Sequence, residues 1–215
     1  MDFRNAKELL KVCQEQSLSI SAVMLQRELT EGEQDPEETD RKMDRVLEIM
    51  KSAASTPIHT PVKSMGGLIG GEAKKISDHK DAGKGLCGDL LERAVIYAMA
   101  TLETNASMGV IVASPTAGSA GIVPGLLLAL QETYDLSDEQ IKQGLYNASA
   151  IGYLAMRNAT VAGAVGGCQA EVGIASAMAA SATVELMGGS PEQSLAAAST
   201  VLMNMLGLVC DPVGG

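Results

Sequence analysis

The sequence has few aromatic side chains and no tryptophan: aromatic residues make up 2% of its 215 residues, whereas 46% are hydrophobic. A core without rings has to be filled by Ala, Val, Leu, Ile and Met, which suits closely packed helices better than a β-sandwich. The length is ample for one domain with a real core. The composition therefore predicts an all-α fold, a compact bundle of close-packed small-residue helices with glycine-rich connecting turns.

Basic residues are scarce as well. The chain has 16 Lys and Arg against 26 Asp and Glu, which gives a formal net charge of −10. Such a chain repels phosphate backbones and offers no stacking aromatics, which disfavours nucleic-acid binding. The four cysteines are too few and too scattered for a secreted disulfide scaffold. The N-terminal sequence MDFRNAKELLKVC lacks the apolar segment of a signal peptide. We therefore expect a cytoplasmic protein.

One long uncharged stretch, residues 107–130, raises the question of a membrane span. It contains Pro115, Pro124 and four glycines, and it has neither an aromatic belt nor flanking clusters of cations. These features favour a buried helical core, and we expect no membrane insertion.

The charged first segment, residues 1–55, predicts three helices. Two are expected at 7–16 and 19–29, the second capped by Ser19. A third begins after Asp35, which is typical of an N-cap residue, with Pro36 at the first helical position. Apolar residues recur along this helix at a spacing that gives one buried stripe: Met43, Val46, Leu47, Met50 and Ala54.

Residues 56–86 are rich in proline and glycine and predict a loop-rich connector. Its sequence GGLIGGEAKK lacks the Gly-Lys-Ser/Thr ending of a phosphate-binding loop. The two histidines of the chain, His59 and His79, lie in this connector, and we expect both at the surface.

Residues 87–215 predict the apolar helical core and complete a single helical domain, 1–215. Helices are expected at 89–105, 122–131, 137–147, 170–186 and 190–206. Two of them open on capping-box pairs, Ser137 with Gln140 and Ser190 with Gln193.

Two cysteines stand out by their surroundings. Cys168 follows two glycines just before a predicted helix, and Cys210 lies just after the last one. A helix N-terminus lowers the pKa of a cysteine and favours the thiolate that binds metals. On the sequence pattern alone, two buried structural thiols are favoured over metal ligands. No Cys or His pair has zinc-ligand spacing, and no serine–histidine–acid arrangement predicts acyl transfer.

A turn at residues 114–121, SPTAGSAG, combines hydroxyl groups, glycines and the start of a helix. This combination can hold a carboxylate on backbone amides. The alternative is a tight turn whose small residues serve helix packing alone.

Three separated motifs follow one another along the chain: LCGDLLERAVIYAMATLETNASMGVIVASPTAGSAGIVPG, AVGGCQAEVG and LGLVCDPVGG. Together they resemble the α subunit of the iron–sulfur-dependent L-serine dehydratases, over about residues 63–215. The resemblance implies dehydration of L-serine to pyruvate and ammonia at a [4Fe-4S] cluster with one open iron that acts as a Lewis acid.

The resemblance also implies roles for individual residues. Cys168 and Cys210 would ligate the cluster, with a third ligand beyond Gly215, so that the chain is expected to be truncated at its C-terminus. The substrate site would be lined by Thr116, Gly118 and Ser119, with Asn105 and Glu171 orienting the ligands. The base is expected on a β subunit, because the chain lacks the family's Ser-Ser-His-Thr motif. We therefore expect a hetero-oligomer and little activity from this chain alone.

Two other functions remain open at this point. A related cluster-dependent L-cysteine desulfidase would differ only in the leaving group. A non-catalytic helical scaffold would use the glycine-rich turns for packing only.

Overall fold

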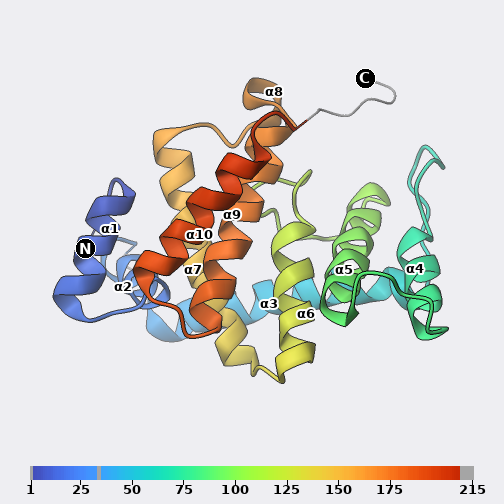
Figure 1. Cartoon of the computed structure of the whole chain (residues 1–215), viewed down its shortest axis with the longest axis horizontal. Coiled ribbons are helices and arrows are strands. Elements are labelled where there is room, and N and C mark those ends of the chain that lie inside the picture. The colour runs from blue at the N-terminus through green and yellow to red at the C-terminus, as the bar shows by residue number, and fades with distance from the viewer. Residues whose placement is uncertain (1, 33–34, 209–215) are drawn as a thin grey trace. The chain divides into compact units, whose positions relative to one another are not determined.

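The structure is a computed structural model, and it describes residues 2–32 and 35–208. All regular secondary structure within these residues is helical (Figure 1). The all-α prediction is therefore confirmed.

The chain divides into two compact units. We call residues 1–43 and 139–215 the discontinuous unit, because both ends of the chain contribute to it, and residues 44–138 the central unit. The expected organisation as a single domain stays a prediction.

The discontinuous unit contains the predicted N-terminal helices and the C-terminal helices. Its elements are α1 (Ala6–Gln16), α2 (Ile20–Glu31), the start of α3 (Pro36–His59), nearly all of α7 (Asp138–Asn158), α8 (Gly163–Gly166), α9 (Cys168–Leu186) and α10 (Pro191–Met205). In Figure 1, α9 and α10 run side by side. Two of the predicted caps are present in this unit: the side chain of Ser19 accepts a hydrogen bond from the backbone N–H of Ala22, and Ser190 and Gln193 form a reciprocal capping box.

The core of this unit joins the two ends of the chain. Phe3, Leu9 and Ile20 are fully buried in one cluster with Tyr146 and Ala150 of α7. Burial of each large apolar side chain contributes about 1.5–3 kcal/mol, so this cluster adds several kcal/mol to the stability of the unit.

A carboxylate of α9 adds a polar contact to this core. Glu185 accepts hydrogen bonds from the backbone N–H of Ile20 at 2.9 Å and from Asn147 Nδ2 at 2.8 Å. Negative charge at a helix N-terminus stabilises the helix, so Glu185 fastens the start of α2 to α7 and α9.

The central unit comprises the rest of α3, α4 (Glu72–Asp81), α5 (Asp89–Ala106) and α6 (Ile122–Tyr134). Helices α5 and α6 were both predicted, and they pack against each other closely. A Cβ atom at Gly121 would lie 2.4 Å from the carbonyl oxygen of Ala98, and one at Gly125 would lie 2.9 Å from that of Ala94. Glycine is therefore required where α6 crosses α5.

The prediction of a loop-rich connector at 56–86 is wrong in two places. Helix α3 continues through Pro57 to His59, and residues 72–81 form α4. The N-cap residue of α4 is Gly71, with φ +91°, and a glycine has no side chain that could signal a cap in the sequence. Instead, the backbone N–H of Ala73 donates to Oε1 of Glu103, a buried carboxylate of α5, at 2.8 Å. A tertiary contact thus replaces the local cap.

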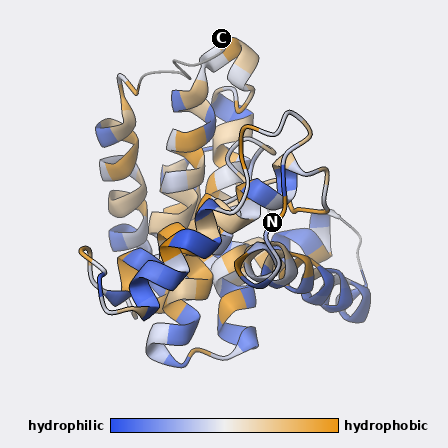
Figure 2. Ribbon diagram, turned by 90° about the vertical axis from the view of Figure 1, so that its right-hand side faces the viewer, coloured by the Kyte–Doolittle hydropathy of each residue, from blue (hydrophilic) through white to orange (hydrophobic). Residues whose placement is uncertain are grey.

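The helices differ widely in polarity. Figure 2 shows some that are blue along most of their length and others that are mainly pale or orange. Within the described residues, no helix combines the length and the apolar character needed to cross a membrane.

Candidate functional site

The predicted substrate turn lies in the central unit, between α5 and α6, and its hydroxyl groups are linked. Ser119 is almost fully buried, and its Oγ donates to the carbonyl oxygen of Ser114 at 3.2 Å. The same Oγ lies 3.2 Å from Oγ1 of Thr116. Since the Ser119 proton is used toward Ser114, the Thr116 hydroxyl is the donor in this pair. The turn is therefore held in one shape by its own side chains.

The tip of this turn faces solvent. Gly118 is exposed, and α6 begins four residues later, after the N-cap residue Gly121. Gly121 supplies no capping side chain, and the backbone N–H of Ile122 donates to the carbonyl oxygen of Ser119 at 3.1 Å. What the start of α6 offers an anion at the exposed tip is therefore its partial positive charge.

Asn105 fixes the turn to α5. Its Nδ2 donates to the carbonyl oxygen of Ala117 at 3.1 Å, which joins the last turn of α5 to the tip of the loop. The structure thus brings together Asn105, Thr116, Gly118 and Ser119, four residues that the sequence analysis selected.

Sequence reasoning missed Ser114 as a member of this group. Its Oγ is buried and, among the residues that the structure describes, has no hydrogen-bond partner. A buried hydroxyl normally finds a partner, so Ser114 marks a polar position beneath the turn. The signal in the sequence was a further hydroxyl just before Pro115, which is also typical of an ordinary turn.

Cys168 lies in the discontinuous unit, at the start of α9. It is half-buried and is the first residue of this 19-residue helix, after Gly167 with φ +75°. The sequence had placed the helix start at Ala170, so the helix begins two residues earlier than predicted. The position at a helix N-terminus is the feature that matters chemically, because the helix dipole favours a thiolate there.

The segment that leads toward Cys210 is bonded to the same helix start. The backbone N–H of Gly207 donates to Oε1 of Gln169, the neighbour of Cys168, at 3.0 Å. Cys210 itself lies outside the described residues. The two cysteine motifs are therefore linked through Gln169 and Gly207, although they are about 40 positions apart.

Glu171 lies in the first turn of α9 and is half-buried. Its carboxylate packs against Gly163 of α8, where a Cβ atom would come within 2.2 Å of Oε2. The glycine makes room for the acidic side chain. Glu171 lies three residues after Cys168, in the first turn of α9.

The remaining sulfur and imidazole groups lie elsewhere. His59 and His79 are exposed, as predicted, although both are in the last turns of helices and not in loops. Burial raises the pKa of the Cys13 thiol to about 11, and the negative charges of Glu185 and Glu192 add to the effect. Within residues 2–32 and 35–208, no group of three or more His, Cys, Asp or Glu side chains could hold a metal ion.

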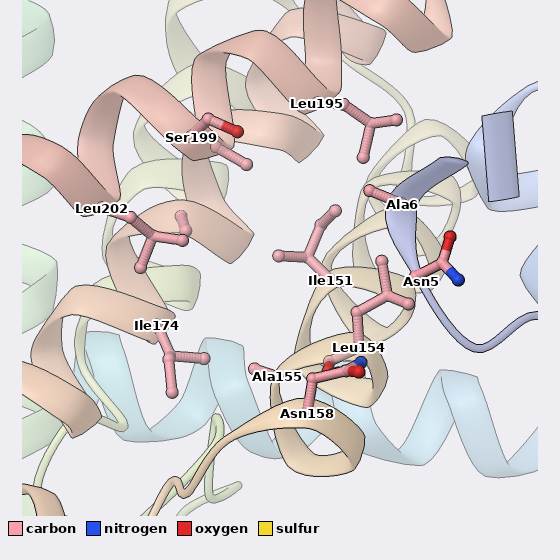
Figure 3. Close-up of a pocket in the computed structure, with 12 residues that line it drawn as sticks. Asn5, Ala6, Ile151, Leu154, Ala155, Asn158, Ile174, Leu195, Ser199 and Leu202 are labelled. Carbon is pink, nitrogen blue, oxygen red and sulfur yellow. The ribbon is translucent and has the colours of Figure 1, made fainter. Parts of the chain in front are cut away.

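Two apolar pockets lie in the discontinuous unit and share Ile174 and Leu202. The first has a volume of about 310 Å³, and Figure 3 shows Ile151 and Leu154 of α7 opposite Leu202 of α10. The second, of about 340 Å³, extends to Gln169 beside Cys168.

Comparison with known proteins gives a consistent result. A family model described as "Serine dehydratase alpha chain" matches residues 15–215. The chain is 48% identical over 213 residues to the probable L-serine dehydratase alpha chain of Bacillus subtilis, covering 99% of this chain and 71% of that protein. It is 43% identical over 210 residues to the L-serine dehydratase alpha chain of Peptoniphilus asaccharolyticus, covering 98% of this chain and 72% of that protein.

Longer relatives contain the same region. An L-serine dehydratase of Escherichia coli is 34% identical over 219 residues, which cover all of this chain but 48% of that protein. Since a family model matches residues 15–215 and two relatives align with 98–99% of this chain, the chain belongs to the serine dehydratase alpha chain family.

Proposed function

We propose that this chain is the α subunit of an iron–sulfur-dependent L-serine dehydratase, a carbon–nitrogen lyase that converts L-serine to pyruvate and ammonia in the cytoplasm. The observation that carries the proposal is the identity of 43–48% to two L-serine dehydratase alpha chains over nearly the whole chain. The turn at 114–119 supports it, because its geometry suits the binding of a small carboxylate.

The turn binds the carboxylate of L-serine. The backbone amides of Gly118 and Ser119 donate to it, at the positive end of α6. Thr116 lines the site beside them, and its hydroxyl keeps the turn in shape through Ser119. The Asn105 side chain holds the turn through Ala117, so the donors are positioned before the substrate arrives.

Cys168 and Cys210 are the ligands that this chain offers to a [4Fe-4S] cluster, with a third ligand still to be identified. The fit rests on the bond between Gln169 and Gly207, which connects the start of α9 to the segment before Cys210. The N-terminus of α9 favours the thiolate form of Cys168 that iron requires. When bound, a cluster with an open iron supplies a Lewis acid for the departing hydroxide.

The chain's own acidic residue near this position, Glu171, orients the start of α9 through its contact with Gly163. The base that removes the Cα proton belongs to a companion β subunit, so the active enzyme is a hetero-oligomer. Loss of water leaves aminoacrylate, which tautomerises to an imine and hydrolyses to pyruvate and ammonia.

The experiment that tests the proposal compares two cysteine variants in the complete enzyme, with its companion chain, prepared without oxygen. Cys168→Ala is expected to lower L-serine turnover at least about a thousandfold, because a missing ligand prevents stable cluster binding. Cys87→Ala, at an exposed cysteine of the other unit, is the matched control and is expected to keep turnover within about twofold.

Iron content, visible absorbance and circular dichroism are measured on the same samples. Cys168→Ala is expected to lose iron and colour while its helical signal is unchanged. A Cys168→Ala enzyme that retains both iron and turnover would contradict the ligand assignment.

The substrate is tested separately with L-serine and L-cysteine on the unaltered enzyme. We expect L-serine to be used at least tenfold more efficiently. A tenfold preference for L-cysteine would replace the dehydratase by a desulfidase, and a colourless, inactive enzyme after iron and sulfide reconstitution would favour a scaffold role.

A further inference from the structure

The central unit contains a polar pocket that the proposed function does not use. Its volume is about 290 Å³, and α3, α4, α5 and α6 all contribute to its walls. The residues of the 114–119 turn are not part of its lining. In size it matches the smaller ligand sites of proteins.

Polar faces of neighbouring helices converge on this pocket. On both α4 and α5, the residues that line it are spaced i, i+3 and i+4, which places them on one face of each helix. These residues are Ser77, Lys80 and Asp81 of α4 and Arg93, Ile96 and Tyr97 of α5. In a chain with so many apolar helices, charged faces directed at a common cavity indicate a binding site and not ordinary core packing.

The two cations of the pocket are held in place by acidic partners. The Lys80 Nζ lies 2.7 Å from Oδ1 of Asp89, and the Lys80 side chain is 17% exposed. The Arg93 Nε lies 2.6 Å from Oδ2 of the same carboxylate, and its guanidinium also pairs with Glu132. Both cations are thus ordered before any ligand binds, which lowers the entropy cost of binding.

Tyr97 completes the network. Burial raises the pKa of its phenol, and the neighbouring Glu132 carboxylate raises it further. The phenol therefore stays protonated at neutral pH and donates its hydrogen bond to Glu132.

The balance of charge identifies the class of ligand. The lining contains two cations, Lys80 and Arg93, and two carboxylates, Asp81 and Glu132. Asp89, outside the lining, pairs with both cations as well. A phosphate would meet two carboxylates, and a metal ion would meet two cations. A small molecule with one charge of each sign meets a partner for both.

The rest of the lining suits a short apolar substituent and further hydrogen bonds. Ile58 and Ile96 supply apolar surface, and Ile96 is 4% exposed. In the part of the chain that the structure describes, the His59 ring and the Ser77 hydroxyl have no hydrogen-bond partner. Both groups are therefore available to a ligand.

We propose that this pocket binds a free α-amino acid with a small side chain, in its zwitterionic form. The carboxylate pairs with Lys80 and Arg93, the ammonium group pairs with Asp81 and Glu132, and the side chain contacts the two isoleucines. The proposal stands on the central unit alone and does not depend on the proposed dehydratase activity.

The test is a calorimetric titration of the chain with L-alanine, which lacks the β-hydroxyl group and cannot be dehydrated. We expect saturable binding at this pocket that Lys80→Met weakens at least tenfold. Lys74→Met is the matched control: this lysine lies on the same helix, pairs with Asp78 at 2.7 Å and is outside the lining, so binding is expected to stay within twofold.

A second variant separates a loss of binding from a loss of the folded structure. Asp81→Asn changes an exposed side chain by one charge and is expected to weaken L-alanine about fivefold while circular dichroism is unchanged. Absence of saturable binding, or unchanged affinity in both Lys80→Met and Asp81→Asn, would overturn the proposal.

Two further arms distinguish a zwitterion site in this pocket from a simple anion site and from binding at the 114–119 turn. Acetate and methylamine each carry one of the two charges, and we expect each to compete with L-alanine at least tenfold more weakly than glycine does. Equal competition by acetate would show a simple anion site and refute the proposal. Thr116→Ala is expected to leave the binding at this pocket intact, whereas its complete loss would assign the binding to the turn instead.

Discussion

The two units of the chain contain pockets of nearly equal size and opposite character. One pocket of the discontinuous unit, about 310 Å³, is lined mainly by aliphatic side chains such as Ile151 and Leu202 (Figure 3). The pocket of the central unit, about 290 Å³, is lined by Lys80, Arg93 and Glu132 among others. Volume alone therefore says little about the ligand. The lining residues determine which ligand a pocket binds, because burial of unpaired charge is costly and burial of apolar surface is favourable.

The two units also differ in how closely their helices approach each other. Where α6 meets α5, glycine lets backbone approach backbone, and a Cβ at Gly121 would collide with a carbonyl oxygen. Where α9 meets α10, a Cβ at Gly173 would lie 3.4 Å from the Cβ of Met205, an ordinary contact distance. The α5–α6 contact of the central unit is thus made by backbone against backbone, whereas the α9–α10 contact of the discontinuous unit is made by side chains.

The largest expected effect follows from this contrast. Gly121→Ala forces α5 and α6 apart and is expected to cost about 2–3 kcal/mol, or about 4–10 °C in Tm. Gly173→Ala is the matched variant and is expected to raise Tm by about 1–2 °C, because alanine favours the helix and meets no backbone. Thermal unfolding followed by circular dichroism measures both changes. Equal changes in the two variants would refute the contrast.

One cysteine of each unit, Cys13 and Cys87, should differ in reactivity. Cys13 of the discontinuous unit is buried, which raises its pKa to about 11, whereas Cys87 of the central unit is exposed. At pH 8, only about one Cys13 side chain in a thousand is thiolate. We expect iodoacetamide to alkylate Cys87 at least about a hundredfold faster, as measured by mass spectrometry of digests.

The pH dependence of this reaction is a further check. Because the pKa of Cys13 is raised, its alkylation rate should climb about tenfold per pH unit from pH 8 toward pH 11. A rate for Cys13 that already levels off near pH 9 would contradict the raised pKa.

The smallest expected effect concerns an exposed ion cluster of the central unit. The hydrogen bond from Arg93, with the contribution of Lys80, lowers the pKa of Asp89 to about 2. A lowered pKa means that the carboxylate stabilises the fold above about pH 4 and that this contribution is lost as the pH falls toward 2. Asp89→Asn should therefore reduce the loss of Tm between pH 5 and pH 3, by less than about 2 °C since the side chain is exposed.

The fold could be predicted from the sequence wherever a helix begins with its own signal. Ser19, Asp35 and Ser190 each cap the helix that they were expected to cap, because their side chains accept a hydrogen bond from the amide three residues later. Helix α4 was missed for the opposite reason. Its first turn is satisfied by Glu103, which is 30 residues distant in the chain, and no local pattern reports such a contact.

The candidate site shows the same limit. The 114–119 turn was visible because its hydroxyls and glycines are contiguous, and Cys168 because glycines precede it. The bond from Gln169 to Gly207 joins residues 38 positions apart and required the structure. The polar pocket of the central unit could not be predicted for the same reason, since its lining residues come from four helices that are far apart in the sequence.

The make-up of the discontinuous unit has a consequence for protein synthesis. Phe3, Leu9 and Ile20 share their cluster with Tyr146 and Ala150, so this cluster stays incomplete until the ribosome has added about 100 residues after Met43. At 5–20 residues per second this takes about 5–20 seconds. During that interval, the surfaces of these residues that contact α7 remain exposed to solvent. The rate of translation across residues 44–138 sets how long this exposure lasts.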